Sequence, residues 1–208
     1  MLVVAAPDFI LNNSNVIKST PIDIQKLKSI KMLVLDVDGI LTDCRLWMDS
    51  NGQWKRIFSV RDGVGIKALI DAGYQLGIIT GSVAEDIRSR VKVLGIQHFY
   101  EGALNKAPAF KDLLQKTGLS PQEMAYMGDD FFDLPILREV QFAATVPDAM
   151  EEVLEHVQYV TRRPAGNGAV REVCDYILKY GHFAKQKTGT GAQQKTGTGA
   201  QQNSNTTT

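Results

Sequence analysis

The 208-residue sequence is poor in several features that mark particular classes of protein. Its two cysteines, Cys44 and Cys174, lie far apart and no CxxC or Cys/His metal spacing occurs, which argues against a disulfide framework and favours a reduced, cytoplasmic compartment. Lys plus Arg and Asp plus Glu number 23 each, so no basic excess indicates nucleic acid or an anionic membrane as a partner. Neither a GxGxxG nor a Walker loop is present, which disfavours a nucleotide-binding module.

Long apolar runs are also scarce. No segment approaches the roughly 20 apolar residues that a membrane-spanning helix needs. The apolar start, Met1–Ala6, lacks a basic region and stops at Pro7, so we do not expect a signal peptide. We expect an N-terminal arm over residues 1–29 and, because residues 187–194 repeat perfectly as 195–202, a low-complexity and disordered tail over 183–208.

Between these ends, apolar segments typical of buried strands alternate with segments typical of helices. Such alternation predicts an α/β fold with a Rossmann-like, doubly wound parallel sheet. Ser82 and Glu85 have the spacing of a capping box and predict a helix start. The predicted strands end near residues 35, 79, 100, 127, 145 and 161, and the predicted helices cover 22–30, 62–72, 82–94, 106–117, 132–139, 148–155 and 168–180.

Residues 44–59 predict a β-hairpin. Asn51-Gly52 lies between two segments rich in apolar residues, which is a strong signal for a two-residue turn. The hairpin would project directly from the segment that carries the first candidate site residues. Its aromatic side chains could pack on the chain's own core or dock on another subunit.

The strongest chemical signal is Asp36 and Asp38, which follow a buried strand and precede Gly39. Residues i and i+2 of a strand share a face, and two carboxylates held so close repel unless a cation lies between them. Oxygen-only ligands suit Mg²⁺. Thr80-Gly81 and Asp129-Asp130 also follow predicted strands, so all three segments should meet at one edge of the sheet.

Each of these residues has an ordinary structural alternative. The acids at 36 and 38 could be solvated, Thr80-Gly81 could be a simple strand-end turn, and Lys106 could be an exposed lysine in the first turn of a helix. Asp129-Asp130 could cap a helix, a role that aspartate favours. These alternatives would all have to hold independently, whereas one phosphoryl-transfer mechanism explains every position.

In this order the segments resemble the four motifs of the haloacid dehalogenase superfamily of phosphotransferases. The resemblance implies that Asp36 is the nucleophile and forms an aspartyl-phosphate, and that Asp38 is the general acid and base. It implies a Mg²⁺ ion held by the Asp36 and Asp129 carboxylates and the Asp38 backbone carbonyl. It also implies that Thr80 and the Gly81 amide bind the phosphoryl oxygens and that Lys106 offsets the charge on them and on Asp36. Asp130 and Asp133 would orient Lys106 and metal-bound water.

Residues 30–182 more specifically resemble the family of 3-deoxy-D-manno-octulosonate 8-phosphate phosphatases. The strings that carry this resemblance are 36–43, 58–66, 128–130 and 168–172. It implies hydrolysis of that sugar-acid phosphate in lipopolysaccharide precursor synthesis by a capless homotetramer. The segment from Asp43 to Arg61 has room only for the hairpin, and the segment from Gly81 to Lys106 only for a helix and a strand, so the hairpin is the only flap expected.

The same resemblance implies a sugar-acid pocket. Arg61 and Arg90 suit the substrate carboxylate, because a guanidinium group matches a carboxylate with two hydrogen bonds. The family commonly has arginine where this chain has Ser82. By position, the substrate-binding residues would be Asp38, Ser59, Val60, Arg61, Asp62, Gly63, Lys67, Gly81, Ser82, Arg90 and Lys106.

Two other functions stay open on the sequence alone. One is a sister phosphatase acting on a nine-carbon sugar phosphate of the sialic acid type. Arg61-Asp62-Gly63 favours the eight-carbon substrate instead, and the absence of arginine at position 82 weakens that preference. The other is a non-catalytic oligomeric scaffold with this fold. Four charged residues that converge on one place argue against a scaffold, because a scaffold does not need them. They are Asp36, Asp38, Lys106 and Asp129.

Overall fold

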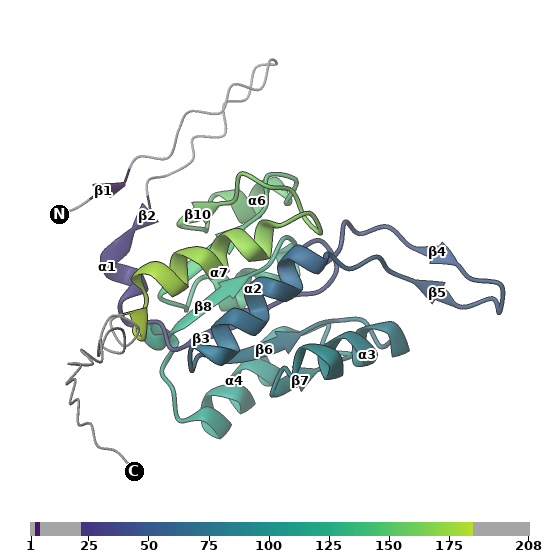
Figure 1. Cartoon of the computed structure of the whole chain (residues 1–208), viewed down its shortest axis with the longest axis horizontal. Helices are drawn as coiled ribbons and strands as arrows, with labels where there is room; N and C mark the ends of the chain where they lie inside the picture. The colour runs from purple at the N-terminus through teal and green to yellow at the C-terminus, as the bar shows by residue number, and fades with distance from the viewer. Residues whose placement is uncertain (1–2, 5–21, 185–208) are drawn as a thin grey trace, which may run out of the picture.

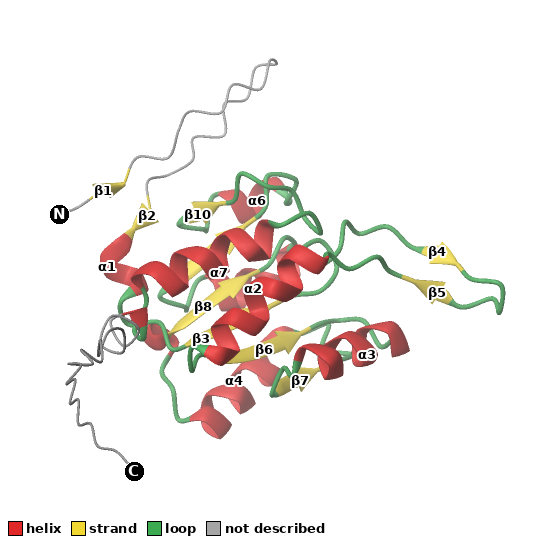
Figure 2. Cartoon of the chain, in the orientation of Figure 1, coloured by secondary structure: helices red, strands yellow, loops and turns green. Residues whose placement is uncertain are grey.

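The computed structural model describes residues 3–4 and 22–184, so the predictions for most of the arm and for the repeated tail lie outside the described residues. Within them, six strands form one sheet in the order β10-β9-β8-β3-β6-β7. Every neighbouring pair in this sheet is parallel, and helices cover both of its faces (Figure 1; Figure 2). This confirms the predicted doubly wound α/β fold. The six strands are β3 (Met32–Leu35), β6 (Gln75–Ile79), β7 (His98–Tyr100), β8 (Met124–Met127), β9 (Phe142–Thr145) and β10 (Tyr159–Val160).

Alternating side chains of β3 fill two separate cores. Leu33 and Leu35 belong to the core on one face, together with residues of the helices at 60–71, 85–94 and 169–180. Met32 and Val34 belong to the core on the other face. A strand buried on both faces explains the uninterrupted apolar run before Asp36. The first face carries α1 (Ile24–Leu27), α2 (Val60–Asp71), α3 (Glu85–Leu94) and α7 (Ala169–Tyr180); the second carries α4 (Lys106–Thr117), α5 (Leu134–Leu137) and α6 (Glu151–Leu154).

Several predicted helices are shorter in the structure. The helix expected over 22–30 covers only α1, after β2 (Ile22–Asp23), which pairs with β1 (Val3–Val4). The helices expected over 132–139 and 148–155 are the single turns α5 and α6, with a 3₁₀ turn (Phe131–Asp133) before α5. In a second 3₁₀ turn (Pro121–Glu123), the Glu123 carboxylate accepts the amide and the hydroxyl of Ser120.

The capping box predicted at Ser82 is wrong. Helix α3 begins at Glu85, after an extended Ala84 that makes no side-chain cap. The Ser82 hydroxyl instead donates to Asp38 Oδ2 at 2.7 Å. A long-range hydrogen bond to the segment after β3 therefore replaces the local cap.

The hairpin consists of β4 (Trp47–Met48) and β5 (Trp54–Lys55) and projects from the body of the molecule (Figure 1). Its turn is not the predicted two-residue one. The Asp49 amide donates to the Gln53 carbonyl at 2.9 Å, and Gly52 adopts a left-handed φ of +73°. Because the Asp49 carboxylate also accepts the amides of Asn51 and Gln53, the loop closes around three residues with glycine last.

No helix in the described part of the chain is long and apolar enough to cross a membrane.

Candidate active site

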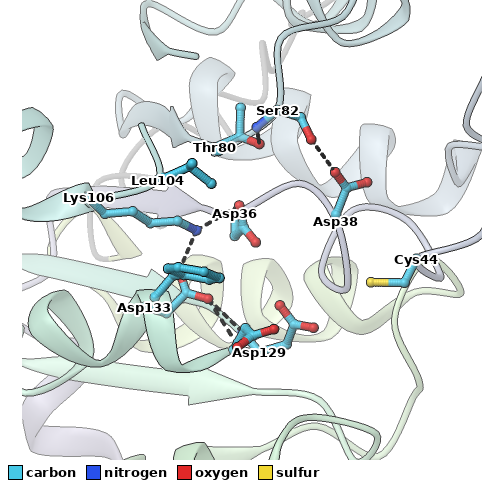
Figure 3. Close-up of a pocket in the computed structure, with 12 residues that line it drawn as sticks. Asp36, Asp38, Cys44, Thr80, Ser82, Leu104, Lys106, Asp129 and Asp133 are labelled. Atoms are coloured by element: carbon cyan, nitrogen blue, oxygen red, sulfur yellow. Dashed lines mark hydrogen bonds and ion pairs between the residues drawn. The ribbon is translucent and has the colours of Figure 1, made fainter. Parts of the chain in front are cut away.

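The carboxyl ends of β3, β6 and β8 meet around a cavity of about 260 Å³ (Figure 3). In a doubly wound sheet this is where ligands bind, since loops of neighbouring strands diverge at the point where strand order reverses. The cavity brings together nine residues predicted for the site: Asp36, Asp38, Thr80, Gly81, Ser82, Lys106, Asp129, Asp130 and Asp133. Cys44, Leu104 and Phe132 complete its lining.

Three carboxylates at this edge lie close enough to share one cation. Asp36, Asp129 and Asp133 each offer an oxygen within 4.8 Å of the others. Both oxygens of Asp133 already accept hydrogen bonds from other groups, so Asp36 and Asp129 are the better metal ligands. Asp129 Oδ1 is buried without a hydrogen-bond partner among the described residues, an arrangement that a bound cation would satisfy.

The electrostatics of the two ligands support the same assignment. Burial raises the pKa of Asp36 to about 7, with Lys106 lowering it and Asp133 raising it further. Burial also raises the pKa of Asp129 to about 8, and repulsion from Asp36 and Asp133 adds to the effect. Carboxylates with such pKa values are stabilised by a divalent cation, so the residues present fit Mg²⁺.

Gly39 makes the approach of Asp129 possible. Its φ is +86°, and a Cβ added there would lie 1.8 Å from Asp129 Oδ2. Any other residue would both strain the backbone and push the carboxylate away. The glycine after the paired aspartates is therefore required by the contact between the loops after β3 and β8.

Lys106 lies beneath the carboxylates at the start of α4 and is only 3% exposed. Its Nζ is 2.8 Å from Asp36 Oδ1 and 2.6 Å from Asp133 Oδ1. Burial opposes its charge, but Asp36 and Asp133 together raise the pKa of Lys106 above its ordinary value. The alternative of an exposed lysine is therefore wrong, and the ammonium group is held against Asp36.

Thr80 and Ser82 form the opposite wall. The Ser82 amide donates to Thr80 Oγ1 at 3.2 Å, which leaves the hydroxyl proton of Thr80 available to an anion in the cavity. Thr80 itself is 1% exposed. At Gly81 a Cβ would lie 2.9 Å from Leu104 Cδ2, so this turn is packed closely against the loop before α4.

Asp38 is paired with a residue that the sequence did not predict as part of the site. Arg56, at the base of the hairpin, donates from Nε to Asp38 Oδ1 at 2.6 Å and from Nη2 to Oδ2 at 2.9 Å. Although burial acts in the opposite direction, the hydrogen bonds from Arg56 and Ser82 lower the pKa of Asp38. Asp86 of α3 also accepts the Arg56 amide at 2.8 Å. No local pattern in the sequence indicates this contact.

Four predicted substrate residues have other contacts. Ser59 caps α2 through the Asp62 amide, and its carbonyl accepts from Arg90 Nη2 at 2.8 Å. Asp62 is buried and accepts the amides of Gly168 and Arg171, so it caps α7. At Gly63 a Cβ would lie 2.5 Å from Arg90 Nη2. Within one chain these residues do not line the catalytic cavity, so their contact with substrate stays a prediction.

The three remaining predicted substrate residues, Val60, Arg61 and Lys67, are exposed on α2. Arg61 lines a separate cavity of about 400 Å³ together with Arg162, Arg163 and Arg171. Asp130, predicted to orient other groups, caps the turn after β8 by accepting the Phe131 amide at 2.6 Å. The helix-cap alternative thus describes Asp130 correctly but not Asp129.

Comparison with known proteins agrees with this geometry. Residues 98–173 match the model of the haloacid dehalogenase-like hydrolases. The chain is 43% identical over 155 residues to the 3-deoxy-D-manno-octulosonate 8-phosphate phosphatase KdsC of Escherichia coli K12, covering 74% of this chain and 82% of that protein. The chain belongs to the KdsC phosphatase family.

Solved KdsC-family structures have the same fold. The 3-deoxy-D-manno-octulosonate 8-phosphate phosphatase of Moraxella catarrhalis, determined with a magnesium ion, a phosphate ion and a KDO molecule, superposes with a TM-score of 0.74 at 41% identity, covering 79% of this chain and 96% of that one. The corresponding enzyme of Yersinia pestis gives a TM-score of 0.76 at 39% identity, covering 81% and 91%.

Proposed function

We propose that this chain is a Mg²⁺-dependent phosphatase that hydrolyses 3-deoxy-D-manno-octulosonate 8-phosphate to the free sugar acid and phosphate. The observation that carries the proposal is the place of Asp36 between two groups. Lys106 Nζ lies 2.8 Å from Asp36 Oδ1, and the nearby Asp129 has a buried Oδ1 that makes no hydrogen bond with the described residues. A nucleophilic carboxylate, a buried ammonium group and a second carboxylate able to bind a metal ion thus share one cavity. The function named for the E. coli relative is the one that this arrangement supports.

In the first step an Asp36 oxygen attacks phosphorus, and the bond from phosphorus to the sugar oxygen breaks. Asp38 gives a proton to that leaving oxygen, so the sugar acid departs as a neutral alcohol. Because Arg56 and Ser82 lower the pKa of Asp38 in the substrate-free chain, this step requires that bound substrate displace these contacts and that Asp38 take up a proton first. Thr80 and the Gly81 amide donate hydrogen bonds to the phosphoryl oxygens, and Lys106 offsets the negative charge on them and on Asp36. Bound Mg²⁺ would supply further charge neutralisation between the carboxylates and the phosphoryl group.

In the second step water attacks the aspartyl-phosphate on Asp36. Asp38, now a carboxylate, takes the proton from this water, and the bond between phosphorus and the Asp36 oxygen breaks. Phosphate is released and both aspartates return to their starting states. The overall change is one ester bond and one water consumed, and one alcohol and one phosphate formed.

We further propose that recognition of the sugar acid needs a second copy of the chain. Arg61 lines a cavity with three other arginines, of which Arg162 and Arg171 already pair with Glu172 and Asp175. Arg61 and Arg163 are therefore the cationic groups there that a substrate carboxylate would pair with. Together with Ser59, Val60, Asp62, Gly63, Lys67 and Arg90, Arg61 lies on α2 and its neighbours, outside the cavity that holds the phosphate-binding residues. A homotetramer in the cytoplasm, acting in lipopolysaccharide precursor synthesis, fits this arrangement.

Phosphate release from eight- and nine-carbon sugar-acid phosphates, assayed side by side, tests the function. The eight-carbon substrate should give the higher kcat/KM, and a chelator should abolish turnover. Asp36→Asn should lower kcat by at least about 10³-fold because the nucleophile is lost, whereas Asp112→Asn, at a half-buried aspartate on α4 that does not line the cavity, should retain full activity. Turnover of neither substrate would favour the scaffold, and unchanged turnover of Asp36→Asn would exclude Asp36 as nucleophile.

A further inference from the structure

Tyr126 is a fully buried polar residue that the mechanism above does not use. It belongs to β8, two residues before the loop that carries Asp129, and its side chain packs in the core on the α4 side of the sheet. It does not line the catalytic cavity. A buried phenol hydroxyl needs a hydrogen-bond partner, and the identity of that partner indicates what the hydroxyl does here.

The partner is Asp133. The Tyr126 hydroxyl donates to Asp133 Oδ1 at 2.5 Å, and Lys106 Nζ approaches the same hydroxyl at 3.4 Å. Because an ammonium group only donates, the phenol proton must point to Asp133. Complete burial raises the pKa of Tyr126 well above its ordinary value, so the hydroxyl keeps this proton.

Asp133 in turn joins two parts of the site. Its Oδ1 accepts from Lys106 at 2.6 Å, and its Oδ2 accepts the amides of Asp129 and Asp130 at 3.0 and 3.2 Å. At Gly128 a Cβ would lie 2.2 Å from the Asp133 carboxyl carbon, so the carboxylate occupies space that only glycine leaves open. The position of one carboxylate therefore determines the position of both the lysine and the metal-binding loop.

We propose that Tyr126 is a positioning residue for the phosphatase reaction: by holding Asp133, its hydroxyl fixes Lys106 and Asp129 relative to Asp36. Removing this hydroxyl would leave Asp133 Oδ1 with Lys106 alone and would loosen the Asp129 loop, although no group that touches substrate is changed. The catalytic part of this inference rests on the proposed function, while the metal-binding part does not.

Tyr159→Phe is a matched control. Tyr159 is also fully buried on a strand of the same sheet, and its hydroxyl also donates to a buried carboxylate, that of Glu172. Neither residue lines the catalytic cavity. Both Tyr→Phe changes remove one buried hydroxyl from a carboxylate, so a purely structural role predicts similar effects for the two variants.

The test measures the Mg²⁺ Kd of the substrate-free protein by calorimetry, together with Tm, kcat and KM. Tyr126→Phe should weaken Mg²⁺ binding about tenfold and lower kcat about tenfold, with KM for the sugar phosphate little changed. Loss of a group that orients metal ligands commonly changes metal affinity or activity by about this factor. Tyr159→Phe should lower Tm and leave Mg²⁺ affinity and kcat at their normal values. If Tyr126→Phe changes only Tm, Tyr126 has no positioning role.

A double-mutant cycle checks that the effect passes through Asp133. In an Asp133→Asn background, Tyr126→Phe should cause little further loss of Mg²⁺ affinity, since the carboxylate that it orients is already gone. Full additivity of the two losses would overturn the proposal. Mg²⁺ binding does not depend on turnover, so inactivity of the unsubstituted chain would refute the proposed function without removing this test.

Discussion

At the scale of single residues, protonation of Asp36 and Asp129 competes with metal binding. Their pKa values of about 7 and about 8 mean that the metal-free site holds protons at neutral pH. Mg²⁺ must displace these protons. Its affinity should therefore fall about tenfold per pH unit for each proton displaced as the pH drops from 8 to 6.

Calorimetry at both pH values, in buffers of different ionisation enthalpy, gives the affinity and the number of protons released. Asp129→Asn should weaken binding strongly and reduce the proton release. Equal Mg²⁺ affinity at pH 6 and pH 8 would show that the two carboxylates are already ionised in the free protein.

The same shifts predict how the stability of the metal-free protein depends on pH. Both carboxyls have pKa values above the ordinary 3.8, so the folded state binds protons that the unfolded chain has lost between about pH 4 and pH 8. The free energy of unfolding that these groups contribute therefore falls as the pH rises through this window. Thermal unfolding should show Mg²⁺ raising Tm more at pH 8 than at pH 6; a larger increase at pH 6 would contradict the assignment.

At the scale of elements, the hairpin depends on Arg56. Among the described residues, all hydrogen bonds that join residues 46–57 to the body are made by this arginine, to Asp38, Ser82 and Asp86. A two-stranded hairpin has little stability of its own. Arg56→Ala should therefore release it from the body.

Limited chymotrypsin digestion measures this release, because Trp47 and Trp54 lie on the hairpin, are uncovered by their own chain and become cleavable when the hairpin detaches. Arg56→Ala should be cleaved there several-fold faster than the unsubstituted chain, with Tm nearly unchanged. Arg88→Ala, which removes an exposed pair with Glu101, is the control and should be cleaved at the normal rate. An equal cleavage rate in Arg56→Ala would show that other contacts hold the hairpin.

Local sequence patterns predicted some features of the site and missed others. The ends of β3, β6 and β8 were predictable because apolar runs stop there, and they brought Asp36, Thr80 and Asp129 together as expected. Arg56 was not predictable, since its contact with Asp38 joins a hairpin to a strand end. Asp62 was assigned to substrate by resemblance, yet its carboxylate caps α7, more than a hundred positions away along the chain. Contacts set by packing leave no periodic signal in the sequence.

At the scale of the whole molecule, the hairpin presents an apolar surface that the chain does not cover. Leu46, Trp47, Met48, Trp54 and Ile57 are each between 48% and 71% exposed. Such a concentration on a projecting element indicates a contact with another protein surface. Among the residues that the structure describes, no arginine lines the catalytic cavity, which is consistent with a neighbouring copy completing the proposed sugar-acid site.

We therefore expect the chain, of 22.9 kDa, to self-associate in solution, as the proposed homotetramer requires. Trp47→Ser with Trp54→Ser should shift light-scattering masses to smaller species, because burial of two tryptophans contributes several kcal/mol to association. The same variant should raise KM for the sugar-acid phosphate at least about tenfold while Mg²⁺ affinity stays normal, since the metal ligands belong to one chain. Val93→Ser, an exposed apolar residue on α3, is the control for loss of surface hydrophobicity. A double tryptophan variant that keeps both the tetramer mass and the normal KM would exclude the hairpin as the element that joins the subunits.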